Sequence, residues 1–448
     1  MASNAVKSPI FRAITKRGVS AQAAASPASS PAGLGQVKTT VLPNKLVVAS
    51  VDSLLPVSTV SVLFKAGSRY EKQESLGTTH MLRIAAGLTT KDSTYFGITR
   101  NLQEIGASLC CDTDREAIAY TLQSTSDKLD TGLKFLQDVT TKQVFKPWEL
   151  SDSIPRLKYE LGGVSPYSKL MDAVHKAAYR SGLGNSLYCP DYLVGKHSTE
   201  SLQHYVKSHF TTNRAAVVGV GVEHGELVCF AQNLPLESGA GPAETAAKYY
   251  GGDVRVETAG DLAHVAVVVE GIHLKNTKEA LAFAVLRYVL GVGPSVKWGS
   301  GASPLVKAVG GAVGNEPFAV SGLNASYSDS GIFGIVASSP ASIAGKEVTL
   351  RVKLMRSGNL SSADVARGKA QLKAAILLAQ EGSATVVEDV GTQAVLLGNV
   401  LSGSAAAAAV DSITDAEVNA AASKVKSGKL SVAAVGNLGN VPYSDQLN

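Results

Sequence analysis

The sequence predicts an α+β protein made of two homologous domains. Strands and helices follow one another in blocks, and the block order of the first half recurs in the second. Between the halves lies the stretch 234–252, which is rich in glycine, proline and alanine and is typical of an exposed linker. We therefore expect a first domain at residues 37–233, the linker at 234–252 and a second domain at 253–448.

The first half opens with strand patterns. Lys38–Val51 is typical of a hairpin with its turn at Pro43 and Asn44, and Val57–Lys65 is a second strong strand. A helix is expected at Gly77–Ile84. The later predicted elements are helix Arg100–Gly106, strands Ser108–Cys111 and Glu116–Ser124, helices Lys128–Thr141 and Ser198–His209, and strand Ala215–Val222.

The second half repeats this order. Strand Leu262–Glu270 matches Val57–Lys65 about 205 residues later, and helix Thr277–Val289 takes the place of Gly77–Ile84. The other repeated elements are helix Ser303–Gly310, strands Ala319–Tyr327 and Gly331–Ser338, helices Ala341–Arg356 and Thr414–Lys426, and strand Leu430–Leu438. One such match could be chance, but six in the same order indicate a duplication.

The composition is that of a globular chain. Of its 448 residues, 45% are hydrophobic and 18% are charged. The longest apolar run, Ala394–Val410, is interrupted by glycine, asparagine and serine, so we interpret it as a buried helical region and not as a membrane span. We expect a soluble or peripheral protein.

Residues 1–36 have the composition of a mitochondrial transit peptide followed by a flexible N-terminus. Four basic residues lie well before the first acidic residue, Asp52; they are Lys7, Arg12, Lys16 and Arg17. A disordered basic tail is the alternative. Removing the four lowers the net charge from +5 to about +1, which argues against nucleic acid as the main partner.

No cofactor is expected. The four cysteines, Cys110, Cys111, Cys189 and Cys229, show neither a metal spacing nor a disulfide framework, and reduced thiols suit the mitochondrial matrix. Cys and His pairs suited to haem or iron–sulfur ligation do not occur in the sequence. The glycines of Val217–Gly225 have the wrong spacing for a dinucleotide fingerprint.

The stretch Gly77–Ile84 reads Gly-Thr-Thr-His-Met-Leu-Arg-Ile. A helix here, with a threonine hydroxyl able to cap its first turn, puts His80, Arg83 and Ile84 on one face. This face resembles the inverted zinc motif His-x-x-Glu-His, and the two-half plan over about residues 37–440 is similar to the pitrilysin family of peptidases. The resemblance implies the metallohydrolase fold of the mitochondrial processing peptidase, in which each half is a mixed, mostly antiparallel sheet covered by helices. An ordinary amphipathic helix is the alternative reading of the motif alone.

Two groups that zinc hydrolysis needs are missing from the motif. Catalytic zinc takes three protein ligands and a water, and a base removes a proton from that water. Arg83 stands where the base should be and Ile84 where the second ligand should be, while the resemblance implies Glu160, about 76 residues on, as the third ligand position. A guanidinium about 5 Å from a dication is repelled by roughly 6 kcal/mol at an effective dielectric constant of about 20. We expect no catalytic residue and no bound metal, and we expect Arg83 to pair with Glu160.

The stretch Gly291–Gly301 is the second candidate site, as a loop that contacts a polypeptide or a partner. Its candidate residues are Gly291, Gly293, Lys297, Trp298, Gly299 and Gly301. It lacks the Gly-Lys-Ser/Thr of a phosphate loop. A flexible connection between two helices is one interpretation. The resemblance implies a shorter relative of the glycine-rich loop with which the non-catalytic subunit of the processing peptidase handles peptides.

Three functions follow from the resemblance. The first is a non-catalytic core subunit of the mitochondrial ubiquinol–cytochrome c reductase complex (complex III), peripheral on the matrix side of the inner membrane. Its partners would be a homologous core subunit, cytochrome b, the cytochrome c subunit and the Rieske protein. The second is the substrate-recognising subunit of the processing peptidase, and the third, an active zinc peptidase, is opposed by Arg83 and Ile84. The short, lysine-bearing glycine loop, the alanine-rich second half and the altered motif favour the first.

Overall fold

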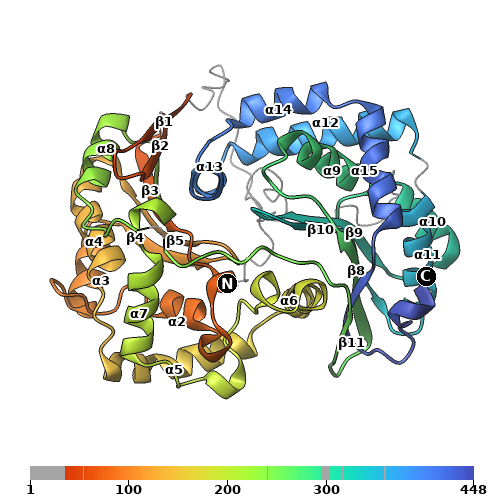
Figure 1. Cartoon of the computed structure of the whole chain (residues 1–448), viewed down its shortest axis with the longest axis horizontal. Coiled ribbons are helices and arrows are strands. Elements are labelled where there is room, and N and C mark those ends of the chain that lie inside the picture. The colour runs from red at the N-terminus through yellow and green to blue at the C-terminus, as the bar shows by residue number, and fades with distance from the viewer. Residues whose placement is uncertain are drawn as a thin grey trace.

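The chain forms two lobes that lie side by side, each built on one β-sheet (Figure 1). The structure is a computed structural model and describes residues 36–53, 55–239, 241–293, 303–313, 316–357 and 360–447. The transit peptide expected at residues 1–36 falls almost wholly outside these ranges and stays a prediction.

The sheet of the first lobe has the order β1-β2-β6-β3-β5-β4. Its strands are β1 (Val37–Val41), β2 (Val47–Val51), β3 (Val57–Phe64), β4 (Ser108–Thr113), β5 (Ile118–Thr125) and β6 (Ala215–Val220). Strands β2 and β6 are parallel, and the other neighbours are antiparallel.

The sheet of the second lobe has the order β7-β11-β8-β10-β9, which repeats β2-β6-β3-β5-β4. Its strands are β7 (Asp253–Glu257), β8 (Leu262–Glu270), β9 (Ala319–Ser326), β10 (Gly331–Pro340) and β11 (Ser431–Gly436). Again one pair, β7 and β11, is parallel and the rest are antiparallel. The predicted α+β class, with two homologous, mixed and mostly antiparallel sheets, is confirmed.

The helices of the two lobes also correspond. Those of the first are α2 (Thr78–Ile84), α3 (Tyr95–Glu104), α4 (Leu129–Thr141), α5 (Pro147–Gly162), α6 (Pro166–Tyr179), α7 (Thr199–His209) and α8 (His224–Gln232). Those of the second are α9 (Thr277–Leu290), α10 (Pro304–Val313), α11 (Ala344–Ser357), α12 (Ser362–Ala379), α13 (Ser383–Leu397), α14 (Gly403–Ser412) and α15 (Asp415–Ser427). Short 3₁₀ turns are η1 (Ser68–Tyr70), η2 (Gln73–Ser75), η3 (Ser126–Lys128), η4 (Gly182–Gly184), η5 (Asp191–Leu193), η6 (Thr212–Arg214) and η7 (Ser444–Leu447).

The predicted helical region Ala394–Val410 contains the end of α13 and most of α14. Helix α13 ends where Gly398 takes a left-handed conformation with φ of +69°, and α14 begins at Gly403. Glycine adopts this conformation without the steric penalty that a Cβ brings, so it stops the helix. Within the described residues, the structure contains no helix that is both long enough and apolar enough to cross a bilayer.

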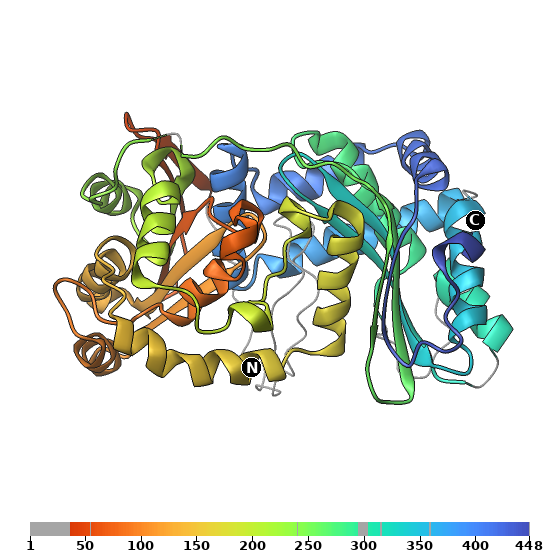
Figure 2. The same cartoon turned by 60° about the horizontal axis from the view of Figure 1, so that its bottom comes forward.

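Each lobe places one helix on the sheet of the other. Helix α6 packs on β8 and β11 of the second lobe, and α13 packs on β2, β3 and β6 of the first. Both helices lie between the lobes in Figures 1 and 2. Apolar side chains fill both contacts: Leu170, Met171 and Val174 meet Ala266 and Val268, while Val386, Val387 and Val390 meet Leu63 and Ala216. Burial of each such Leu, Val or Met side chain contributes about 1.5–3 kcal/mol.

A buried ion cluster joins the lobes at the turn between β9 and β10. The Arg69 guanidinium of the first lobe lies 2.8 Å from Glu116 Oε1 and 2.6 Å from Asp329 Oδ1 of the second. Ser328 then donates its main-chain N–H and its hydroxyl to Glu116, at 3.0 and 2.6 Å. Side-chain exposure is 5% for Arg69 and 2% for Glu116. Arg69, Glu116 and Ser328 are buried, and the side chain of Asp329 is 26% exposed. These mutual hydrogen bonds fix the turn against the first lobe.

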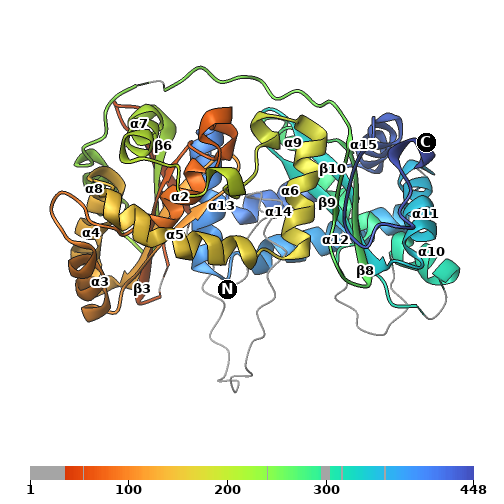
Figure 3. The same cartoon turned by 90° about the horizontal axis from the view of Figure 1, so that it is seen from below.

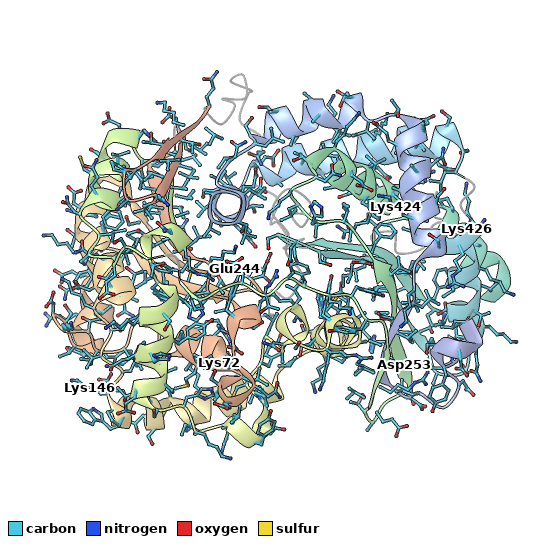
Figure 4. The ribbon with its side chains drawn as sticks, viewed as in Figure 1. Lys72, Lys146, Glu244, Asp253, Lys424 and Lys426 are labelled. Carbon is cyan, nitrogen blue, oxygen red and sulfur yellow. The ribbon has the colours of Figure 1, made fainter. Side chains whose placement is uncertain are left out.

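The segment between α8 and β7 crosses from one lobe to the other (Figure 3). Its Glu244, labelled in Figure 4, accepts hydrogen bonds from Lys65 at 2.8 Å and Arg214 at 2.9 Å in the first lobe. The hydroxyls of Tyr249 and Ser431 are 2.6 Å apart, which ties the same segment to the second lobe. The crossing is therefore anchored at both ends.

The ion cluster gives a stability prediction. The substitution Arg69→Met leaves Glu116 and Asp329 without their cation, so we expect it to lower the free energy of unfolding by about 3–5 kcal/mol. The matched control is Lys38→Met, because the Lys38–Asp52 pair is 53% exposed on both sides, and its loss should cost less than about 1 kcal/mol. Urea unfolding followed by tryptophan fluorescence measures both. Equal urea midpoints for the two variants would show that the buried ion cluster does not stabilise the fold more than an exposed ion pair does.

Candidate functional site

Helix α2 carries the motif residues and is started by a buried carboxylate. Glu71 accepts hydrogen bonds from the main-chain N–H groups of Gly77 and Thr79, at 2.8 and 2.7 Å. Gly77 has φ of +85°, and a Cβ there would lie 2.5 Å from Cys189 Cα. The expected threonine cap is wrong, because Thr78 donates its hydroxyl to Ser75 O instead. Burial raises the pKa of Glu71 to about 7, although the donors favour its ionised form.

His80 is fully buried within the first lobe. Its Nδ1 accepts a hydrogen bond from the main-chain N–H of Cys189 at 3.1 Å. Its Nε2 lies 3.4 Å from Glu160 Oε2, and the Tyr188 ring packs edge-on against the imidazole. Burial lowers the pKa of His80, so the ring is neutral near pH 7.

Glu160, on α5, is the centre of the site. Arg83 donates a short hydrogen bond to Glu160 Oε2, and Arg156 lies 3.3 Å from Oε1. The side chains of Arg83 and Glu160 are 26% and 24% exposed. The contact with His80 and the charge of Arg83 lower the pKa of Glu160 to about 2. The predicted pairing of Arg83 with Glu160 is therefore present.

Ile84 lies outside this group of polar residues. It is 2% exposed and packs in the hydrophobic core of the first lobe, with Leu82 and Leu102 in the same cluster. Its side chain fills space in the core and offers no lone pair to an ion.

These residues do not fit a catalytic zinc ion. His80 and Glu160 are two donors, the site needs three, and the oxygen of Glu160 that faces His80 already accepts from the Arg83 guanidinium. Across the described ranges, His, Cys, Asp and Glu side chains form no group of three or more that could hold a metal ion.

The second candidate site, the glycine-rich loop, lies largely outside the described residues. Lys297, Trp298, Gly299 and Gly301 fall in the undescribed range 294–302. Gly291 and Gly293 are described, and Gly291 caps the end of α9: its N–H donates to Arg287 O at 3.0 Å, and its carbonyl accepts from Gly322 at 2.7 Å. Gly291 thus connects α9 to the second sheet.

Three further residues shape the motif site and were not predicted from the sequence. Arg156 precedes Glu160 by one helical turn, and this spacing was a readable signal. Glu71 and Cys189 act on α2 through main-chain N–H groups, at the start of the helix and at His80 respectively. Every residue except proline has a main-chain N–H, so the sequence does not show which of these groups makes such a contact.

With the fold and the motif geometry in place, the family can be named. The family "Insulinase (Peptidase family M16)" matches residues 47–191, and "Peptidase M16 inactive domain" matches residues 196–372. The chain belongs to peptidase family M16.

Particular members of the family are similar over nearly the whole chain. The human protein "Cytochrome b-c1 complex subunit 2, mitochondrial" is 42% identical over 433 residues, which covers 95% of each chain. The Arabidopsis thaliana "Probable mitochondrial-processing peptidase subunit alpha-1" is 29% identical and covers 92% of this chain and 84% of its own. A chain of "Complex III2 from Candida albicans, Inz-5 bound" has the same fold, with a TM-score of 0.79 at 21% identity, covering 92% of this chain and 99% of its own.

The lowered pKa of Glu160 predicts a pH dependence. A carboxylate with a depressed folded-state pKa stabilises the fold above its unfolded pKa, so the contribution is lost as pH falls from about 4.5 to about 2. Allowing for solvent screening, we expect Glu160→Gln to cost about 1 kcal/mol at pH 7 and progressively less toward pH 2. Thermal unfolding across this range measures it, with exposed Glu74→Gln as the control. If the difference in stability between Glu160→Gln and the unsubstituted protein did not change with pH, the lowered pKa of Glu160 would be contradicted.

Proposed function

We propose that this chain is a non-catalytic core subunit of the mitochondrial ubiquinol–cytochrome c reductase complex, needed for the assembly and stability of that complex. The observation that carries the proposal is the 42% identity with the human cytochrome b-c1 complex subunit 2 over 95% of both chains. Both lobes take part in that match, so the relationship extends beyond the motif.

The chain acts through its surfaces and not by hydrolysis. At the motif, Arg83 and Ile84 supply neither the base nor the second ligand that zinc chemistry needs, and Glu160 is bonded to two guanidinium groups. We interpret the site as a degenerate metal site in which Arg83 replaces the cation. This interpretation is supported by the depressed pKa of Glu160.

The partners and the location belong to the same proposal. The chain would pair with a homologous core subunit and contact cytochrome b, the cytochrome c subunit and the Rieske protein, as a peripheral protein on the matrix side of the inner membrane. The acid-free, basic composition of residues 1–36 supports import into mitochondria. The domain limits 37–233, 234–252 and 253–448 are part of this proposal, and the place of β6 in the first sheet supports the first of them.

The second candidate function is substrate recognition in the processing peptidase. It is supported by the 29% identity with the Arabidopsis alpha subunit and by the glycines that follow α9. The lower identity makes it the weaker proposal. In that case residues 291–301 would contact an extended presequence peptide.

Co-purification separates the two candidates. An affinity tag at the C-terminus of the full chain, recovered from detergent-solubilised mitochondria, should bring down cytochrome absorbance and the Rieske protein in fixed proportion. We also expect loss of the chain to lower the amount of assembled complex III. A detergent-independent heterodimer that cleaves presequences would instead support the processing peptidase and overturn the first proposal.

A further inference from the structure

A main-chain N–H of the loop before α7 determines which nitrogen of the His80 imidazole can act as a hydrogen-bond acceptor or metal ligand. Cys189 points its main-chain N–H at His80 Nδ1, with a donor–acceptor distance of 3.1 Å. Both residues are buried, with exposures of 0% for His80 and 2% for Cys189. Water therefore does not compete for this hydrogen bond.

This contact fixes the tautomer of the ring. An N–H donor requires a lone pair on Nδ1, so the single proton of the neutral imidazole resides on Nε2. The carboxylate of Glu160, with Oε2 at 3.4 Å from Nε2, can only accept. The donors and acceptors on both sides of the ring thus agree on the same tautomer.

A metal-binding histidine has the opposite arrangement. It offers the lone pair of one nitrogen to the ion, and its other ring N–H donates to a carboxylate, a carbonyl or water. For His80 to bind an ion through Nε2, the proton would have to move to Nδ1, where it would face the Cys189 N–H. Two donors would then point at each other in a buried place. Binding through Nδ1 would instead require Cys189 to move away.

The loop that carries Cys189 is held too firmly for that movement. Asn185 donates to the carbonyls of Ser68 and Glu71, at 3.0 and 3.2 Å. Asp172 accepts from the main-chain N–H of Leu187 at 3.2 Å. On the other side Cys189 meets the backbone of Gly77, where even a Cβ would be too close.

We infer that the site carries a second obstacle to zinc, in its main chain, and that restoring the two missing motif side chains does not restore a zinc site. This inference rests on the proposed reading of a degenerate metal site. It adds that the Cys189 N–H holds His80 as a hydrogen-bond donor to Glu160. The change from metal ligand to structural donor therefore involves a backbone group that no motif comparison detects.

The first test uses the full chain with Arg83→Glu and Ile84→His together, dialysed against zinc and analysed for metal content. Its matched control adds Glu160→Gln. Because the Cys189 N–H keeps the His80 proton on Nε2, that nitrogen has no lone pair for the ion. We therefore expect the two variants to bind zinc with affinities equal within about twofold. One equivalent of zinc bound more than about tenfold tighter by the double variant than by its control would overturn the inference.

The second test does not depend on the double variant being folded. Nitrogen NMR of the unsubstituted full chain, labelled with ¹⁵N-histidine and assigned through His80→Gln, should find the proton of His80 on Nε2. A proton on Nδ1, or exchange between both nitrogens, would overturn the inference even if the double variant failed to fold. Neither test depends on co-purification with cytochromes, so failure of the proposed function would be recognised separately.

Discussion

Each lobe contributes one helix, α6 or α13, to the sheet of the other lobe. The burial of both sheets and the position of Glu160 depend on this exchange. The inner face of each sheet is apolar where it meets the helix of the other lobe, so neither lobe can bury that face alone. Gly391 of α13 allows the close approach, because a Cβ there would lie 2.7 Å from Leu63 Cδ1. The exchange also reaches the motif site. Helix α5, which bears Glu160, ends at Gly162 and α6 begins at Pro166, so inter-lobe packing of α6 helps to set the position of Glu160 opposite α2.

Electrostatics explains how the site remains stable without an ion. A partly buried carboxylate needs a cation, and Glu160 has two guanidinium groups, one on α2 and one on its own helix. Arg83 comes from the same helix as His80, and both side chains contact Oε2 of Glu160. The attraction now links α2 to α5 directly.

The features that were readable from the sequence are those with a local or repeated pattern. The strands Val57–Phe64 and Leu262–Glu270, about 205 residues apart, indicated the duplication. The pairing of Arg83 with Glu160 was expected because the family resemblance implied Glu160 as the third ligand position. Helices α5 and α6 were not predicted, because Pro155 lies inside the first and is unfavourable there, and the second packs against the sheet of the other lobe. The Glu71 cap and the Cys189 donor act through main-chain groups, which have no residue signature.

The counterpart helices α2 and α9 differ in how completely other elements cover them. Helix α9 is the counterpart of α2, but α10, α12, α14 and α15 all pack against it, and every residue from Ala280 to Leu290 is buried. A metal site needs one helix face open to substrate. Among the described elements α2 packs mainly against β4, α5 and α7, and the side chain of its Arg83 is 26% exposed. From Ala280 to Leu290, α9 therefore presents no open face, whereas α2 presents Arg83 both to solvent and to Glu160.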